Sequence, residues 1–371
     1  MTTKTSPYIY PFTPFKYLDV TEQNTAMVDG DRLDIAALSA MAEPIAPALS
    51  LPPAETLAQR ILALFTTPDI LFGEASFVTS RSDEWLSRIS YLIEQERPIE
   101  FTILGFPFKM PVPLKTNRKT ADFGELVSLK RLNEIGRAVA QAYEPGARVH
   151  VFTEGPFHVL NGIERSWADG YFASLQAMIE QFGIDSNLVL HDLNRVADDT
   201  PEFRQVWNSA TEDIRARRDA ADPATLDAIK DALPVRFHNI YNPGASIDDL
   251  RRAYLNDGTR EELRAAITAR AEEGVLGYRA FLEARDRISL LDKYAPDAIG
   301  MTVSPRPGRL GVRPLPEPAD KLPYHGVPVL SHDRNTLRID YLWDLQHGGG
   351  AYRKVSLVGD TDPAPFVYIE E

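Results

Sequence analysis

The sequence predicts an α/β protein with a Rossmann-like, mostly parallel sheet flanked by helices. The first observation is that short apolar strand segments alternate with amphipathic helices between residues 99 and 193, the pattern of a parallel sheet covered on both faces. The second is a mostly helical block at about 201–295, which we interpret as a helical insertion. The third is a C-terminal series of strand patterns separated by Pro and Gly, which we expect to extend the same sheet.

The predicted elements follow one another in a regular order. Apolar residues recur at helical spacing in 52–65 and 83–96, and again in 125–143 and 168–183. The strand candidates are "IEFTILGFPF" at 99–108, "ARVHVFTEG" at 147–155, "NLVLHDL" at 187–193, and later segments at 299–307, 308–315, 326–332 and 337–345.

The chain is expected to divide into two parts. Residues 1–55 are rich in proline and weakly periodic, so we expect an N-terminal arm or cap. Residues 56–371 would form the α/β catalytic domain, including the helical block. Inside that block, capping boxes from Ser246 to Asp249 and from Thr259 to Glu262 predict helix starts.

Composition excludes several classes of protein. Of the 371 residues, 44% are hydrophobic and 25% are charged, as in globular domains. The 40 Lys and Arg against 53 Asp and Glu give a net charge of -13, which disfavours nucleic acids and anionic membranes as partners. The absence of cysteine excludes disulfides and thiolate chemistry. No apolar run suits a signal peptide or a membrane span, so we expect a cytoplasmic protein.

Familiar cofactor and metal motifs are missing from the sequence. It has no G-x-G-x-x-G, no Walker A loop and no H-E-x-x-H, so we expect no cofactor and no metal site. The "HGGG" at 347–350 matches an esterase oxyanion loop, but the G-x-S-x-G elbow that such enzymes need does not occur. We interpret this segment as a flexible turn.

The densest group of charges follows the first strand. Four cations and two carboxylates occur there, namely Lys109, Lys115, Arg118, Lys119, Asp122 and Glu125. Such cations can hold a phosphate, and a neighbouring carboxylate can act as a base or orient an amine. The alternative is a solvated loop whose charges pair with each other. Lys109 is the strongest candidate because it directly follows an apolar strand and can point into a cleft.

Three histidines are further candidates for acid or base roles. His191, with Asp192, closes the third strand, and a structural role for it is as plausible as a chemical one. His325 lies between turn residues and a strand and carries the same ambiguity. His150 alternates with Phe152 along its strand, so we expect it to be structural.

Several separated segments resemble the isocyanide synthase family of pyoverdine and dityrosine biosynthesis. They are "GFPFK" at 105–109, "ADFGE" at 121–125, "FTEGPFHVL" at 152–160, "GYRAFLEARD" at 277–286, and "MTVSPRPGRLGVRPL" at 301–315 followed by "LPYHGV" at 322–327. Together they cover roughly residues 99–329. The order and spacing of the segments carry the resemblance, since none of them is decisive alone.

The resemblance implies a Rossmann-like fold and a reaction without a redox cofactor. The amine of an amino acid, typically tyrosine or tryptophan, would condense with the C2 carbonyl of ribulose 5-phosphate, and the imine would be deprotonated and fragmented to leave an isocyanide. The substrates would be small molecules, an amino acid and a pentulose phosphate. Downstream partners could be an oxygenase or peptide-assembly enzymes.

The same resemblance assigns roles to individual residues. Lys109 would hold phosphate or polarise the ketone, Asp122 and Glu125 would orient the amine and move protons, and His325 would be a further acid or base. The remaining residues expected to bind substrate or phosphate are Arg118, Lys119, Glu154 and Arg313.

The sequence also departs from the family pattern. Ser304 stands where the family has His, Tyr324 replaces Trp, and the usual arginine near Gly300 is missing; Arg306, Arg309 and Arg313 could replace that cation. Two alternatives therefore stay open. One is a related enzyme that gives an N-formyl or otherwise altered product, and the other is a non-catalytic protein that binds a sugar phosphate or an amino acid.

Overall fold

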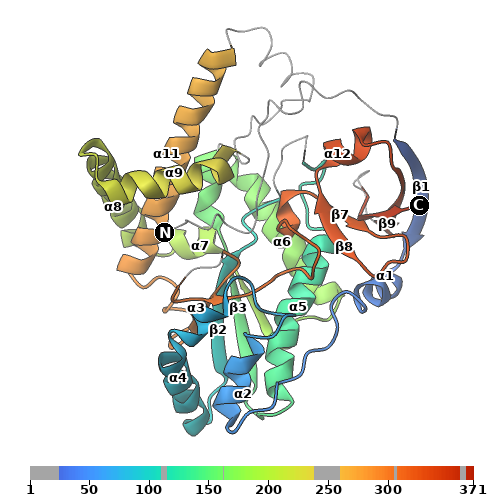
Figure 1. Ribbon diagram of the computed structural model, residues 1–371, viewed down its shortest axis with the longest axis horizontal. Coiled ribbons are helices and arrows are strands. Elements are labelled where there is room, and N and C mark those ends of the chain that lie inside the picture. The colour runs from blue at the N-terminus through green and yellow to red at the C-terminus, as the bar shows by residue number, and fades with distance from the viewer. Residues whose placement is uncertain (1–24, 110–114, 162, 238–259, 305–306, 360–364) are drawn as a thin grey trace.

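The computed structural model describes residues 25–109, 115–161, 163–237, 260–304, 307–359 and 365–371 (Figure 1). Its first sheet has the order β4-β3-β2-β5-β6, and every neighbouring pair is parallel. The strands are β2 (Ile99–Gly105), β3 (Ala147–Thr153), β4 (Leu188–His191), β5 (Ile299–Thr302) and β6 (Leu310–Gly311). This is the strand order of a Rossmann-like sheet, which confirms the predicted fold class.

Helices precede β2 and follow β2, β3 and β4. They are α2 (Leu57–Leu64), α3 (Ala75–Thr79) and α4 (Ser82–Glu94) before β2, α5 (Phe123–Ala140) after β2, a 3-10 turn, η2, at Gly155–Asn161 and α6 (Arg165–Gln181) after β3, and α7 (Leu193–Asp198) after β4. Helices α2, α4, α5 and α6 lie close to the positions predicted from the helical spacing of their apolar side chains, whereas α3 and α7 were not predicted.

The two faces of the first sheet have different surroundings. Phe101, Ile103 and Val149 belong to the main core together with the apolar face of α5. Strand residues alternate in direction, so Thr102 and His150 lie on the opposite face, toward the helical block. The face that packs on α5 is therefore apolar, while the other face carries buried polar groups.

The helical block is built from α8 (Pro201–Asp219), α9 (Pro223–Phe237) and α11 (Arg260–Arg287). Figure 1 shows these helices gathered on one side of the molecule, with α11 packed against both of the others. The predicted capping boxes at 246–249 and 259–262 begin outside the described residues.

A second sheet has the order β1-β9-β10-β7-β8. Its strands are β1 (Ala26–Leu33), β7 (Val327–Leu330), β8 (Leu337–Asp340), β9 (Ala351–Leu357) and β10 (Val367–Glu370), accompanied by α1 (Ile35–Ala42), α12 (Leu342–His347) and a 3-10 turn, η3, at Pro323–His325. β1 pairs in parallel with β9, so part of the segment expected to be an arm forms a strand of this sheet. The division at residue 55 stays a prediction.

The expectation that all C-terminal strands extend one sheet is correct for β5 and β6 and wrong for β7 and β8. The outer edge of β6 is already occupied, because the amide of Phe72 donates to the carbonyl of Gly311 and Leu71 forms an antiparallel bridge with Val312. No ladder hydrogen bonds remain there for a further strand, and β7 pairs with β10 and β8 instead.

Among the described residues there is neither a membrane-spanning helix nor a set of metal ligands. No helix there combines the length and the apolar character needed to cross a bilayer. Nor do three or more His, Asp or Glu side chains of these segments come together as a set that could hold a metal ion. The "HGGG" segment begins at the end of α12, where Nδ1 of His347 lies 2.9 Å from the carbonyl oxygen of Trp343.

Candidate active site

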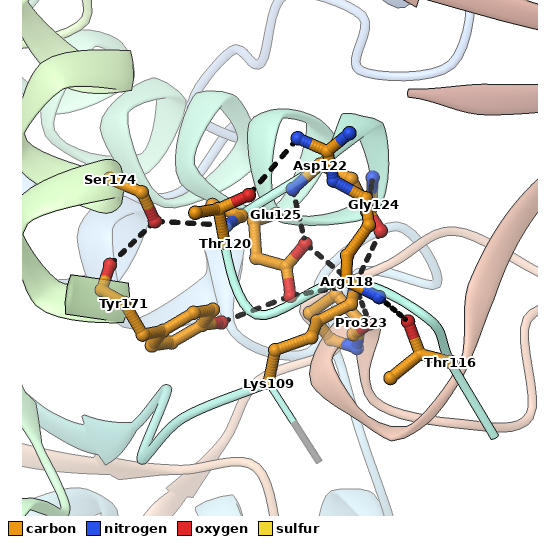
Figure 2. Close-up of polar contacts among 11 residues, drawn as sticks. Lys109, Thr116, Arg118, Thr120, Asp122, Gly124, Glu125, Tyr171, Ser174 and Pro323 are labelled. Atoms are coloured by element: carbon orange, nitrogen blue, oxygen red, sulfur yellow. Dashed lines mark hydrogen bonds and ion pairs between the residues drawn. The ribbon is translucent and has the colours of Figure 1, made fainter. Parts of the chain in front are cut away.

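Lys109 follows β2, and its side chain is completely buried. Its Nζ atom lies 2.6 Å from Oδ2 of Asp122 and donates to both carboxylate oxygens of Glu125, at 3.0 and 3.1 Å. It also donates to the backbone carbonyl of Pro323 at 2.9 Å. Figure 2 shows these groups converging. The ammonium group therefore joins the first sheet, the start of α5 and the turn before β7.

Asp122 and Glu125 are positioned by the start of α5. Asp122 is the N-cap and accepts from the amide of Gly124, while Glu125 in the first turn accepts from the amide of Asp122 at 2.9 Å. This capping box satisfies amides that have no partner inside the helix, and the helix dipole favours negative charge at this end. The "ADFGE" segment thus fixes both carboxylates next to Lys109.

The three side chains form a coupled buried set, with one cation facing two carboxylates. Burial and the charge of Glu125 raise the pKa of Asp122 well above its usual value. Burial also acts to raise the pKa of Glu125, but the charge of Lys109 and hydrogen bonds outweigh it, so that pKa is lowered. The two pKa values are thus moved apart, so Asp122 holds its proton to a higher pH than Glu125 does, which places a weaker acid beside a stronger one.

Two tyrosines complete the surroundings of this set. The hydroxyl of Tyr171, on α6, donates to Oε1 of Glu125 at 3.0 Å, and the tyrosine is 1% exposed. Burial and the charge of Glu125 raise the pKa of Tyr171 well above the usual value. Tyr324 is also buried, and its ring lies 5.9 Å from that of Phe106. Neither Tyr171 nor Tyr324 is among the site residues predicted from the sequence. The feature of the sequence that could have indicated Tyr171 is its polar hydroxyl among the buried apolar residues of α6.

His325 lies in η3, two residues after the carbonyl that accepts from Lys109. It is buried, and its ring packs against Tyr324 with centroids 4.8 Å apart. Glu154 lies at the end of β3 and accepts a hydrogen bond from Tyr278 of α11 at 3.2 Å. His325 thus lies in the same 3-10 turn as the carbonyl that accepts from Lys109. Glu154 instead contacts the helical block.

The other predicted cations do not converge on Lys109. Arg118 is buried, donates to Thr120 at 3.0 Å, and lines a cavity of about 320 Å³ near Phe366. Lys119 is exposed, with its ammonium group 4.3 Å from the centre of the Trp167 ring. Arg313 pairs with Glu317 at 3.0 Å and lies over Phe72, which is a separate place. These three cations therefore have three different sets of partners among the described residues, and their roles stay predictions.

The solvated-loop alternative is also wrong for most of this segment. Lys109, Asp122 and Glu125 pair with each other, as that alternative supposes, but they do so with no exposed surface. Lys115 is completely buried as well, and burial lowers its pKa to about 7. From the sequence, Lys115 was as compatible with the surface as with the site, so its burial was not predicted.

The histidines of the first sheet form a row on the face toward the helical block. Nε2 of His150 lies 2.7 Å from a carboxylate oxygen of Glu100, and Nδ1 lies 2.8 Å from Nε2 of His191. The His191 ring stacks on Phe152 with centroids 4.3 Å apart. This row is separate from Lys109, which favours the structural interpretation of both histidines.

Comparisons with known proteins agree with this fold. A family model described as pyoverdine/dityrosine biosynthesis protein matches residues 89–247. The chain is 27% identical to an L-tyrosine isonitrile synthase from Pseudomonas aeruginosa over 271 residues, which are 71% of this chain and 80% of that protein. The chain is similar to the pyoverdine/dityrosine biosynthesis proteins.

Further relatives of this kind include an L-tryptophan isonitrile synthase from Fischerella ambigua, 27% identical over 155 residues, which are 41% of this chain and 44% of that protein. The crystal structure of the PvcA protein from Pseudomonas aeruginosa has a TM-score of 0.68, covering 85% of this chain and 100% of that chain at 24% identity, and it confirms the fold. The named isonitrile synthases confirm the prediction of an enzyme of this type. The roles of individual residues stay predictions.

Proposed function

We propose that this protein converts the amine of an amino acid to an isonitrile. The similarity to isonitrile synthases for tyrosine and tryptophan is the observation that carries the proposal. The buried set of Lys109, Asp122 and Glu125 at the carboxyl end of β2 supports it, because ligands of such sheets bind beyond the carboxyl ends of the strands.

The chemistry requires protons to be moved in both directions. Condensation of an amine with a ketone removes two protons from nitrogen and releases water. The isonitrile carbon is bonded only to nitrogen, so both carbon–carbon bonds of the former ketone carbon must break. Ionised Glu125 can accept a proton and protonated Asp122 can donate one, with Lys109 holding the charge between them.

The proposed co-substrate is ribulose 5-phosphate, which supplies the ketone carbon. Arg118, one of the predicted phosphate-binding residues, lines a cavity close to the start of α5, which supports this role for it. His325 and Glu154 complete the proposed site from η3 and the end of β3. The proposal also includes a cytoplasmic location and a downstream oxygenase or peptide-assembly enzyme that consumes the product.

The set around Lys109 has no exposed surface, so the proposal requires its walls to move when substrates bind. This requirement separates the proposed enzyme from a protein in which the same contacts only stabilise the fold. Substrate binding without any rearrangement near Tyr171 and Tyr324 would contradict the proposed roles of Lys109, Asp122 and Glu125.

Mass spectrometry of the purified protein with ribulose 5-phosphate and a panel of amino acids tests the proposal. We expect consumption of the sugar that depends on one amino acid, with an isonitrile product. A product heavier by one water would indicate the N-formyl alternative. Ligand-dependent thermal stabilisation without turnover would indicate the binding-protein alternative and would contradict the proposed reaction.

A further inference from the structure

A second polar cavity, of about 270 Å³, lies away from Lys109. It is bounded by the start of α4, the end of α11 with the segment after it, and the start of β5. Thr102 of β2 lines it, which places the cavity on the face of the first sheet opposite to α5. Asp122 and Glu125 belong to α5, so the two sites lie on different faces of one sheet.

Four arginines line this cavity in a protein whose net charge is -13. They come from three parts of the chain, Arg81 and Arg88 from the α4 region, Arg285 from α11, and Arg309 from the segment before β6. The lining also includes three carboxylates, Glu84, Asp286 and Asp292. The cavity therefore has a surplus of positive charge where the molecule as a whole has a surplus of negative charge.

Two of these arginines pair with carboxylates of the lining, and a third donates to a backbone carbonyl. Arg81 pairs with Glu84 at the rim. Arg285 is 3% exposed and pairs with Asp286 at 2.6 Å, but the Asp286 side chain is 63% exposed and so is screened by water. Arg88 donates to the backbone carbonyl of Ala298 at 3.1 Å. A buried guanidinium with a mostly solvated counter-ion is a group that a small anion can bind.

Two glycines make room for these guanidinium groups. A Cβ atom at Gly300 would overlap Nη1 of Arg309, and a Cβ atom at Gly308 would overlap Nη1 of Arg81. Gly308 has a φ of +82°, which also disfavours other residues. Gly300 pairs with Thr102 in the sheet, so Arg309 lies directly over the strands. The absence of side chains at both positions allows two cations to reach the cavity wall.

We propose that this cavity binds the phosphate group of a small phosphorylated molecule, with Arg285 and Arg309 as its main ligands. Guanidinium groups bind phosphate oxygens through paired, charge-assisted hydrogen bonds, and the Thr102 hydroxyl adds a neutral donor. The cavity is larger than one inorganic anion needs, which leaves space for the rest of a small metabolite. The inference does not depend on the proposed function, because it uses no residue of the Lys109 site.

Calorimetric titration with inorganic phosphate and with ribulose 5-phosphate tests this inference. We expect R285M and R309M each to weaken phosphate binding about tenfold or more. G300A is the sharpest variant, since its methyl group would displace the Arg309 guanidinium without changing the net charge. Alanine is acceptable in a strand, and the displaced group is the end of a flexible side chain, so this variant should fold.

R217M is the matched control. Arg217 is an exposed arginine of α8 that pairs with Glu283, so R217M changes the net charge equally at a residue that does not line the cavity. It should leave phosphate binding unchanged. R118M serves as the comparison for the other predicted phosphate site. If R118M abolishes binding while R309M and G300A do not affect it, the inference is overturned, as it is if the wild-type protein binds neither ligand at millimolar concentration.

The two ligands distinguish the sources of the phosphate. If ribulose 5-phosphate binds more tightly than phosphate and competes with it, the phosphorylated co-substrate is the ligand. If phosphate binds and the sugar phosphate does not compete, a different phosphorylated molecule is the ligand. Product formation tests the proposed reaction separately. If the protein forms product but R309M binds phosphate as the wild type does, only this inference is contradicted. If the variants weaken phosphate binding but no product forms, only the proposed reaction is contradicted.

Discussion

Asp122 and Glu125 bind the same ammonium group from the two ends of one capping box. Their positions, three residues apart, place both carboxylates on the first turn of α5, and Lys109 is the cation that both of them contact. The environment nevertheless moves their pKa values in opposite directions, upward for Asp122 because of burial and downward for Glu125 because the charge of Lys109 and hydrogen bonds together outweigh burial. Predictions about stability and chemistry follow from this asymmetry.

K109M should strongly destabilise the protein. Removal of the cation leaves an ionised carboxylate buried without its partner, which typically costs about 3–5 kcal/mol. Chemical denaturation followed by circular dichroism measures this loss. K119M is the matched control, since Lys119 is exposed and contacts an aromatic ring, and it should cost about 1 kcal/mol or less. A loss of similar size in both variants would contradict the buried ion pair.

D122N and E125Q should differ although both remove a carboxylic acid. Asn mimics the protonated form that the raised pKa of Asp122 favours, and it can still accept from the Gly124 amide, so about 1 kcal/mol or less should be lost. E125Q leaves Lys109 without an ionised partner and should cost about 3 kcal/mol. Unfolding free energies measured at pH 7 check the order. A larger loss in D122N would reverse the assignment of the proton.

Lys115, unlike Lys109, is expected to make the stability of the protein depend on pH. Burial lowers its pKa to about 7, whereas an unfolded lysine releases its proton near pH 10.4. Between these values the unfolded state binds more protons, so this group makes stability rise with pH, by at most about 1.4 kcal/mol per pH unit. K115M should flatten the rise measured between pH 7 and pH 10. An identical pH profile in wild-type protein and K115M would show that Lys115 is charged at pH 7.

His191 should make the fold sensitive to acid. Burial, and secondarily the neighbouring His150, lower the pKa of His191 to about 4, while an unfolded imidazole takes its proton near pH 6.5. The unfolded state therefore binds more protons in this window, and the stability contributed by neutral His191 is lost as the pH falls from about 6.5 toward 4. H191F keeps the ring that stacks on Phe152 and should reduce this loss. H332Q, at an exposed site, should leave the pH profile as it is in the wild type.

The first sheet could be predicted from the sequence, and so could Lys109, Asp122 and Glu125 as candidates for the site. Lys109 was identifiable because it follows an apolar strand, and Asp122 and Glu125 because they belong to the same charged segment and to a stretch that resembles the family. The contacts of Lys109 with Pro323 and of Glu125 with Tyr171 were not identifiable, since they join residues far apart in the chain. The same limit applies to β1, whose partner β9 lies at the other end of the sequence.

The sequence also did not show which of the two sheets each C-terminal strand joins. Periodicity indicates that 326–332 is a strand, but it does not indicate its neighbours. The occupation of the β6 edge by Leu71 and Phe72 decides that question, and it comes from a loop with no strand pattern of its own. Similarly, counting cations did not reveal that Arg118, Lys119 and Arg313 lie in three different surroundings.

The bond from Lys109 to the Pro323 carbonyl has a consequence for how the protein is made. The amide of Phe123, at the start of α5, likewise donates to the carbonyl of Phe366, close to the last residue. A ribosome-bound chain can form β2, β3 and α5 early, but it lacks these two carbonyls until residues 323 and 366 have been added. The two carboxylates at the start of α5 would therefore acquire their full surroundings only when the C-terminal strands dock, so a chain that ends before Pro323 should leave Lys109 without one of its buried partners.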